Sequence, residues 1–192
     1  MSDNLKWLHA DVQQNRELLE KEDSQLARRN YLRSLVALYE LTLSNLRERT
    51  AKLLVDKFEF DGQWNLHEII PLLDDIATLS DNGKLKLNPN RLPFLSLVAY
   101  MLKTYAKLID YPENVLSDNR WQAFRQTITI RHRITHPKLY SDIDITNDEL
   151  QLIDEGRNWW NDTLNELWKT HSKKVVDGYN QPRVIPQSFG GS

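Results

Sequence analysis

Apolar side chains recur about every 3.6 residues along most of the chain, a spacing that predicts helices rather than strands. A thin apolar stripe predicts a polar first helix over residues 4–22. A fuller stripe predicts a second helix that begins after Asp23 or Ser24, either of which can cap it, and runs to about Lys57. The pattern also allows the two helices to be continuous.

Turn-forming residues separate the expected elements in the middle of the chain. Residues 66–79 are expected to form a short helix, kinked at Pro71 and stopped by the Asp-Asn-Gly run at 81–83. Residues 84–92 are expected to be a loop. Pro93 suits the first turn of the most apolar helix, which ends near Tyr111-Pro112.

Two further helices complete the chain. Ser117 is expected to cap an amphipathic helix over residues 117–136, which Pro137 closes. Thr146 and Glu149 have the spacing of a capping box, and the final helix is expected to reach about Lys174. The predicted fold is therefore all-α, a bundle of four principal helices with an extra N-terminal helix and a short additional helix.

The same pattern divides the chain into three parts. Residues 1–23 form a polar N-terminal extension, residues 24–176 the helical bundle, and residues 177–192, rich in proline and glycine, a flexible tail. A length of 192 residues suits one domain. The Trp159-Trp160 pair and Trp168 are expected in the core or at a dimer interface, and the Arg28-Arg29-Asn30 run on a solvated face.

Composition narrows the functional classes. A net charge of −2 argues against broad, non-specific binding of nucleic acid, although it allows a local basic cleft. The absence of cysteine removes disulfides and thiolate metal sites and fits a reducing cytoplasm. We see no secretory signal and no apolar run long enough to span a bilayer, so we expect a cytoplasmic protein with no membrane partner.

The helix over 117–136 carries an arginine where apolar residues are expected. On a helical wheel Arg131 falls within the apolar arc, whereas Arg133 falls on the solvent side. A charge directed at a packing surface needs an anionic partner or ligand. The apolar arc contains Trp121, Ala123, Phe124, Thr127, Ile128, Ile130, Ile134 and Thr135.

Two interpretations of Arg131 remain open. With His136 at the helix end, it can support RNA cleavage without a metal: a neutral imidazole takes the proton of a 2′-hydroxyl, and the guanidinium holds the phosphate. Histidine suits this role because its pKa lies near neutral pH. Alternatively, Arg131 pairs with a bundle carboxylate such as Glu40, and His136 is only a cation at a helix end.

The run from Arg131 to Pro137 resembles the motif of the HEPN superfamily, an arginine followed after four to six residues by a histidine. Here the match is Arg131, the polar His132, and His136 after four intervening residues. The sequence Ala37-Leu38-Tyr39-Glu40 is similar to a pattern on an early helix of that family, and the capped start at 145–150 is similar to its last helix. The resemblance covers roughly residues 24–174.

The resemblance implies a four-helix bundle that dimerises so that two motifs face one cleft. It implies a metal-independent endoribonuclease of a toxin–antitoxin or antiviral defence system, giving 2′,3′-cyclic phosphate and 5′-hydroxyl ends, with RNA and possibly an antitoxin or another defence-system protein as partners. Arg131 and His136 would be catalytic, His132 would assist, and Glu40 would pair with Arg131. One toxin group of the family has a tyrosine where this chain has Lys138. Some members are non-catalytic, so a binding or scaffold module is the alternative.

The sequence contains few other candidate sites for a cofactor or a ligand. His132 and His136 are four residues apart, as zinc-binding histidines on a helix can be, but the chain has no cysteine and has Arg133 where an HExxH motif has its glutamate, so we expect neither a metal nor a cofactor. A basic cleft that contacts RNA phosphates would be formed by Arg131 together with Arg120, Arg125, Arg133 and Lys138.

Overall fold

The computed structural model describes residues 3–61, 66–112 and 114–180, which are mostly helical. The elements are α1 (Asp3–Lys21), α2 (Gln25–Asp61), α3 (Leu66–Ile69), the 3₁₀ turn η1 (Ile70–Leu72), β1 (Asp75–Leu79), β2 (Leu85–Pro89), α4 (Phe94–Leu108), α5 (Arg120–Thr135), the 3₁₀ turn η2 (Tyr140–Ile143) and α6 (Asn147–Asn180). In the described residues, no helix is both long and apolar enough to cross a bilayer.

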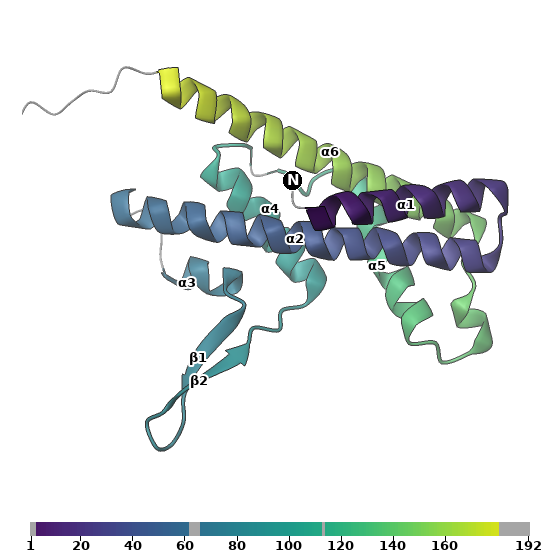
Figure 1. Ribbon diagram of the computed structural model, residues 1–192, viewed down its shortest axis with the longest axis horizontal. Coiled ribbons are helices and arrows are strands. Elements are labelled where there is room, and N and C mark those ends of the chain that lie inside the picture. The colour runs from purple at the N-terminus through teal and green to yellow at the C-terminus, as the bar shows by residue number, and fades with distance from the viewer. Residues whose placement is uncertain (1–2, 62–65, 113, 181–192) are drawn as a thin grey trace, which may run out of the picture.

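The four principal helices expected from the sequence are α2, α4, α5 and α6, and α2 runs through the middle of the molecule (Figure 1). Its apolar stripe is buried as predicted, apart from Leu53, which is half-buried. In the core, the ring of Tyr39 of α2 packs against Phe124 of α5 and Trp160 of α6, with ring centroids 5.1 and 5.2 Å away. Trp159 and Trp160 are therefore core residues.

The first helix is separate from the second and lies alongside it (Figure 1). Ser24 caps α2, because its Oγ accepts a hydrogen bond from the Ala27 N–H at 3.2 Å. Val12 and Leu19 of α1 are buried. The polar N-terminal segment is thus packed along the bundle rather than left free.

The expected helix over 66–79 and loop over 84–92 are wrong for most of their length. Helical structure ends at Leu72, and the following residues form an antiparallel hairpin in which Asp75 pairs with Pro89 and Leu79 with Leu85. The Asn82-Gly83 pair, which we expected to stop a helix, lies in the hairpin turn, and Gly83 has the positive φ of +74° that such turns require. An Asn-Gly pair between two short apolar runs is itself a strong sequence signal for a β-hairpin.

Helix boundaries at the chain's second half were predicted with mixed success. The capping box is confirmed, since Thr146 and Glu149 exchange hydrogen bonds of 3.0 and 3.2 Å between backbone N–H groups and side chains. The cap at Ser117 is wrong: α5 begins at Arg120, and Ser117 bonds to the Asn114 carbonyl instead. The last helix continues to Asn180, so the predicted tail from residue 177 starts as helix, and residues 181–192 lie outside the described part.

Gly156 lies where α6 crosses α5. A Cβ there would lie 2.8 Å from Thr127 Oγ1 and 2.9 Å from the Cα of Phe124, so the two backbones would have to separate. We expect Gly156→Ala to lower the free energy of unfolding by about 2 kcal/mol, because overpacking outweighs the gain in helix propensity. Urea unfolding measures this, with the exposed neighbour Glu155→Ala as a control expected to change stability by less than about 0.5 kcal/mol. An unchanged Gly156→Ala variant would contradict the close crossing.

The stability of the fold should depend on the protonation of His171. Its Nδ1 hydrogen-bonds to the Tyr105 hydroxyl, and burial, aided by the nearby Arg49 charge, lowers the pKa of the imidazole below its ordinary 6.5. The unfolded chain then binds more protons than the native one between these two pKa values, so stability rises as pH rises through that window and falls as the solution is acidified.

Urea unfolding from pH 5 to pH 8 tests this dependence. We expect His171→Gln to remove the part of the slope near pH 6, because the native and unfolded chains then no longer differ in proton binding at this position. A variant with the same slope as the wild type would show that His171 is not responsible.

Candidate functional site

Arg131, which the helical wheel placed in the apolar arc, lies near the C-terminal end of α5 and contacts α2. Its Nη2 is 3.5 Å from Oε1 of Glu40, 91 residues earlier on α2. The two side chains are 36% and 52% exposed. The predicted pairing with Glu40 is therefore present, but at the surface and not inside the bundle.

The contact between these two side chains is weak. A distance of 3.5 Å is the outer limit for a hydrogen bond, and exposed ion pairs of this kind contribute little to stability. Within the described residues, the Arg131 guanidinium makes no other hydrogen bond or ion pair. Most of its donors remain available for a second anion.

Two exposed histidines accompany Arg131 at the end of α5. The rings of His132 and His136 lie 5.0 Å apart, centroid to centroid, at an angle of 55°. His136 is the C-terminal cap of the helix, with φ −126° and ψ 60°, and its N–H donates to the His132 carbonyl at 3.0 Å. Pro137 ends the helix there, as the sequence predicted. We call Arg131, His132 and His136 the α5-end cluster.

Arg133 does not project freely into solvent, contrary to expectation. It binds both carboxylate oxygens of Glu149 at 2.8 and 2.9 Å and the Asp142 carbonyl at 3.0 Å. Asp142 in turn accepts the backbone N–H groups of Leu139 and Lys138, which hold the pKa of its carboxyl below the ordinary value. The Arg133 side chain therefore links the loop after α5 to the first turn of α6 through these hydrogen bonds.

That loop presents side chains that sequence reasoning overlooked. Leu139 and Tyr140 are among the most exposed large side chains of the described chain, while their backbone is held by the contacts with Asp142 and Arg133. Lys138 is exposed beside them. Only the exposure marks Leu139 and Tyr140, which no sequence spacing distinguished beforehand, whereas Lys138 was among the predicted RNA contacts.

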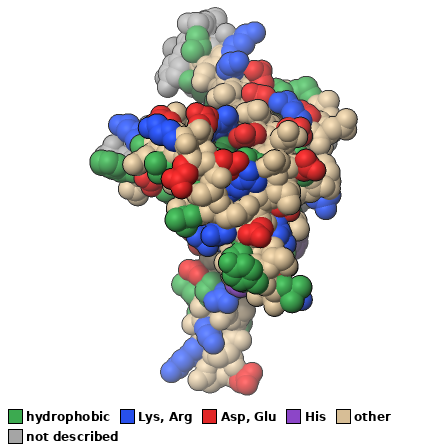
Figure 2. All heavy atoms as spheres, turned by 90° about the vertical axis from the view of Figure 1, so that its right-hand side faces the viewer, with side chains coloured by type: hydrophobic (Ala, Val, Ile, Leu, Met, Phe, Trp, Pro, Cys, Tyr) green, Lys and Arg blue, Asp and Glu red, His purple; other side chains and the backbone are tan. Residues whose placement is uncertain are grey.

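The remaining predicted RNA contacts do not join this cluster. Arg125 is exposed and bonds to Gln122, about 9 Å along the helix axis from Arg131. Arg120 lies about 16 Å from Arg131 along the axis, at the other end of α5. The predicted basic residues therefore do not form one cleft. On the face of the molecule drawn in Figure 2, acidic and basic side chains are intermingled.

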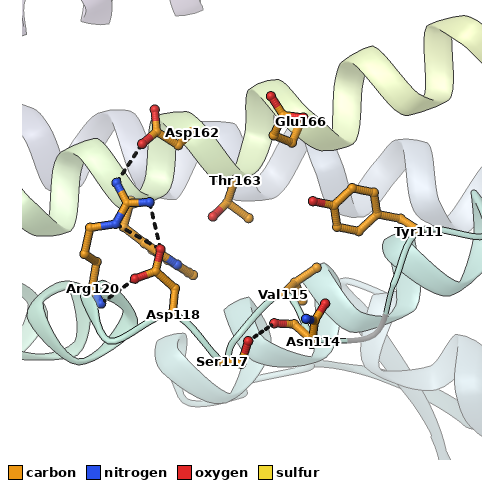
Figure 3. Close-up of a pocket in the computed structure, with 10 residues that line it drawn as sticks. Tyr111, Asn114, Val115, Ser117, Asp118, Arg120, Asp162, Thr163 and Glu166 are labelled. Carbon is orange, nitrogen blue, oxygen red and sulfur yellow. Dashed lines mark hydrogen bonds and ion pairs between the residues drawn. The ribbon is translucent and has the colours of Figure 1, made fainter.

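Arg120 belongs to a different hollow, between the start of α5 and α6 (Figure 3). It bonds to Asp118 at 2.7 and 2.9 Å and to Asp162 at 2.7 Å, and these bonds raise the pKa of its guanidinium. The hollow has a volume of about 260 Å³, and Trp159, whose buried indole N–H finds no hydrogen-bond partner among the described residues, forms part of its wall. Arg120 is thus committed to carboxylates of this chain.

A second hollow, of about 370 Å³, lies between α1, α2 and α6. Its polar wall includes Arg16 and Arg157, which are 3.5 and 3.9 Å from the same carboxylate oxygen of Asp154. Neither hollow includes the α5-end cluster, which is an open surface. An open surface suits a polymer better than a small molecule, which binds in concave pockets.

The end of α5 supplies three kinds of group that could contact a ligand. It offers a guanidinium with spare donors, two accessible imidazoles and an exposed hydrophobic loop. In the described residues, no three or more His, Cys, Asp or Glu side chains are grouped so that they could hold a metal ion. Comparison with protein-family models, with curated proteins and with solved structures gives no match.

Proposed function

We propose that this chain is a metal-independent endoribonuclease of the HEPN type, acting as a homodimer in the cytoplasm. The observation that carries the proposal is the α5-end cluster: a guanidinium held only by a 3.5 Å contact with Glu40, on the same short stretch as two exposed imidazoles 5.0 Å apart. We also propose that the protein acts in a toxin–antitoxin or antiviral defence system, and this part of the proposal rests only on the sequence motif from Arg131 to His136.

In the proposed reaction, neutral His136 removes the proton of a ribose 2′-hydroxyl, and the 2′ oxygen attacks the adjacent phosphorus. Arg131 binds the non-bridging phosphate oxygens and stabilises the charge that develops on them. The bond to the 5′ oxygen breaks, and protonated His132 returns a proton to that oxygen. The products are a 2′,3′-cyclic phosphate and a 5′-hydroxyl.

Glu40 has a defined part in this scheme. Its carboxylate holds Arg131 on the α2 side in the absence of RNA, and a phosphate would compete with it for the guanidinium. Because the pair is exposed, breaking it costs little. A dimer that brings two such clusters together would concentrate positive charge locally on a chain whose net charge is −2.

One observation favours a second candidate, a non-catalytic binding module of the same fold. The Glu40 carboxylate already occupies the side of Arg131 that faces α2, and neither of the two hollows described above includes the cluster. Such a module would bind RNA, a nucleotide or a protein partner at the end of α5 and cleave nothing.

An assay with purified protein, tRNA or mRNA, and EDTA separates the two candidates. The ribonuclease proposal expects cleavage that persists in EDTA and leaves 2′,3′-cyclic phosphate ends, detected by their resistance to ligation and polyadenylation until the phosphate is removed. Binding of the same RNAs without cleavage would support the module. Cleavage that requires a divalent metal, or leaves 3′-hydroxyl ends, would contradict the proposed mechanism.

A further inference from the structure

The rings of His132 and His136 have the separation of two imidazoles that bind the same metal ion. A ring centroid lies about 1.1 Å behind the coordinating nitrogen, and that nitrogen lies about 2.0 Å from zinc, so two histidine ligands at a tetrahedral angle place their centroids about 5 Å apart. The separation in this structure is 5.0 Å, and the interplanar angle of 55° shows that the rings are not stacked face to face. The pair therefore has the spacing of a two-histidine chelate.

The last turn of α5 sets this spacing. Residues four apart on an α-helix lie one above the other on the same face. Although the φ and ψ of His136 are no longer helical, its N–H still donates to the His132 carbonyl at 3.0 Å, the bond of a regular helical turn. Because the backbone holds the two positions together before a ligand arrives, binding of an ion requires little further ordering of the chain.

The ring nitrogens of both histidines are available to a ligand. Both side chains are exposed, and among the described residues neither ring makes a hydrogen bond or an ion pair. A neutral imidazole has one nitrogen that carries no proton, and this nitrogen can accept a hydrogen bond or bind a metal. Each ring can therefore contribute one ligand atom.

The two arginines next to these histidines in the sequence each lie beside a carboxylate. Arg131 Nη2 is 3.5 Å from Oε1 of Glu40, and Arg133 binds both carboxylate oxygens of Glu149 at 2.8 and 2.9 Å. Their positive charges are therefore partly balanced, and the water around this exposed surface weakens what repulsion is left. A divalent cation can approach the two rings.

We propose that His132 and His136 together bind one Zn²⁺ ion, and that the bound ion inhibits the ribonuclease activity proposed above. The binding is independent of that activity, whereas the inhibition rests on it. Zinc is the ion that fits, because imidazole is one of its common ligands. Mg²⁺ and Ca²⁺ prefer oxygen ligands, and Cu⁺ prefers sulfur ligands, which neither histidine provides.

The number of protein ligands makes this an exchangeable site. In the described part of the chain, no third His, Cys, Asp or Glu side chain joins the pair in a group that could hold a metal. Water would complete the tetrahedral coordination of the ion. The proposed ion is therefore an inhibitor that binds and leaves, and the cleavage reaction itself remains independent of metal.

Inhibition follows from the role proposed for each imidazole. His136 has to accept a proton from the 2′-hydroxyl, and His132 has to return a proton to the 5′ oxygen. A nitrogen whose lone pair is bound to zinc cannot accept a proton and carries none to donate. One bound ion would thus block both proton transfers.

Isothermal titration calorimetry of the untagged full chain with ZnCl₂ tests the binding. We expect one ion per chain, and a loss of affinity of at least about tenfold in His132→Gln and in His136→Gln, because each variant loses the gain from two linked ligands. The matched control, His67→Gln, removes an exposed histidine on α3 and should change the dissociation constant by less than about twofold. No binding at about 1 mM Zn²⁺, or equal losses in all three variants, would overturn the proposal.

Cleavage assays distinguish this inference from the ribonuclease proposal. If both hold, Zn²⁺ stops cleavage of a labelled RNA with half-inhibition near the dissociation constant from calorimetry, and excess EDTA restores the rate. Zinc binding by the two histidines without RNA cleavage in EDTA would support the metal site and contradict the ribonuclease. Cleavage that continues at zinc concentrations that saturate the site would overturn the inhibition.

Discussion

Replacement of His136 by alanine is expected to lower the rate of RNA cleavage by about 10² to 10⁴, the usual contribution of a general base. Arg131→Ala should cause a loss of similar size, because the phosphate then lacks its charged donor. Both side chains are substantially exposed and make few contacts, so both variants should unfold at nearly the wild-type temperature. Initial rates on a labelled RNA in EDTA, with a thermal melt of each variant, give both quantities.

His67→Ala provides the matched control for this experiment. It removes another exposed imidazole, on α3, outside the α5-end cluster, and should leave the rate unchanged. Equal rates for the wild type and all three variants would mean that the observed cleavage comes from elsewhere in the protein or from a contaminant. Activity that survives His136→Ala but not Arg131→Ala would reassign the base, with His132 as the next candidate.

Replacement of Arg28 by methionine is expected to lower the free energy of unfolding by about 3 kcal/mol. The side chain is 8% exposed and bonds to the carboxylate of Asp23, the Ile145 carbonyl at 2.6 Å and the Asn147 side chain. Methionine fills the space but removes the donor to the Asp23 carboxylate and to the Asn147 amide oxygen, while the Ile145 carbonyl keeps its bond from the Gln25 side chain at 3.0 Å. Urea unfolding at neutral pH measures the loss.

The neighbouring Arg29 is the control for this replacement. It makes one bond, of 3.3 Å, to the Ile143 carbonyl and is half-buried, so Arg29→Met should cost less than about 1 kcal/mol. If both variants lost the same stability, the effect would come from charge and not from the network of Arg28. A stable Arg28→Met variant would mean that water replaces the lost bonds to Asp23 and Asn147.

These two arginines also show how a surface interpretation fails. The sequence indicated a solvated face for Arg28-Arg29-Asn30, yet Arg28 joins the α1–α2 turn to Ile145 and to Asn147 at the start of α6, 117 and 119 residues away. Its partners are a backbone carbonyl and an amide that only the fold brings near. Charge patterning along one helix carries no information about such partners.

At the candidate site, too, the local sequence predicts some features, and only the fold determines the partners of the charged side chains. The position of Arg131 on the side of α5 facing α2, and the end of α5 at His136 before Pro137, follow from helical periodicity and proline stereochemistry. Whether its guanidinium is buried depends on where the bundle stops covering α5, which periodicity does not specify. The commitment of Arg120 to Asp162 and of Arg133 to Glu149 depends on α6 in the same way.

By itself, the sequence determined the helices and those ends that are set within four residues: the Ser24 cap, the Thr146–Glu149 box and the stop at Pro137. Each is a local interaction, so neighbouring residues suffice to predict it. The tertiary structure alone decided which charges stay free and how far strand pairing extends from the Asn82-Gly83 turn. Those outcomes depend on burial and on strand pairing between residues up to 14 positions apart, and on partners more than 100 positions away, none of which the local pattern specifies.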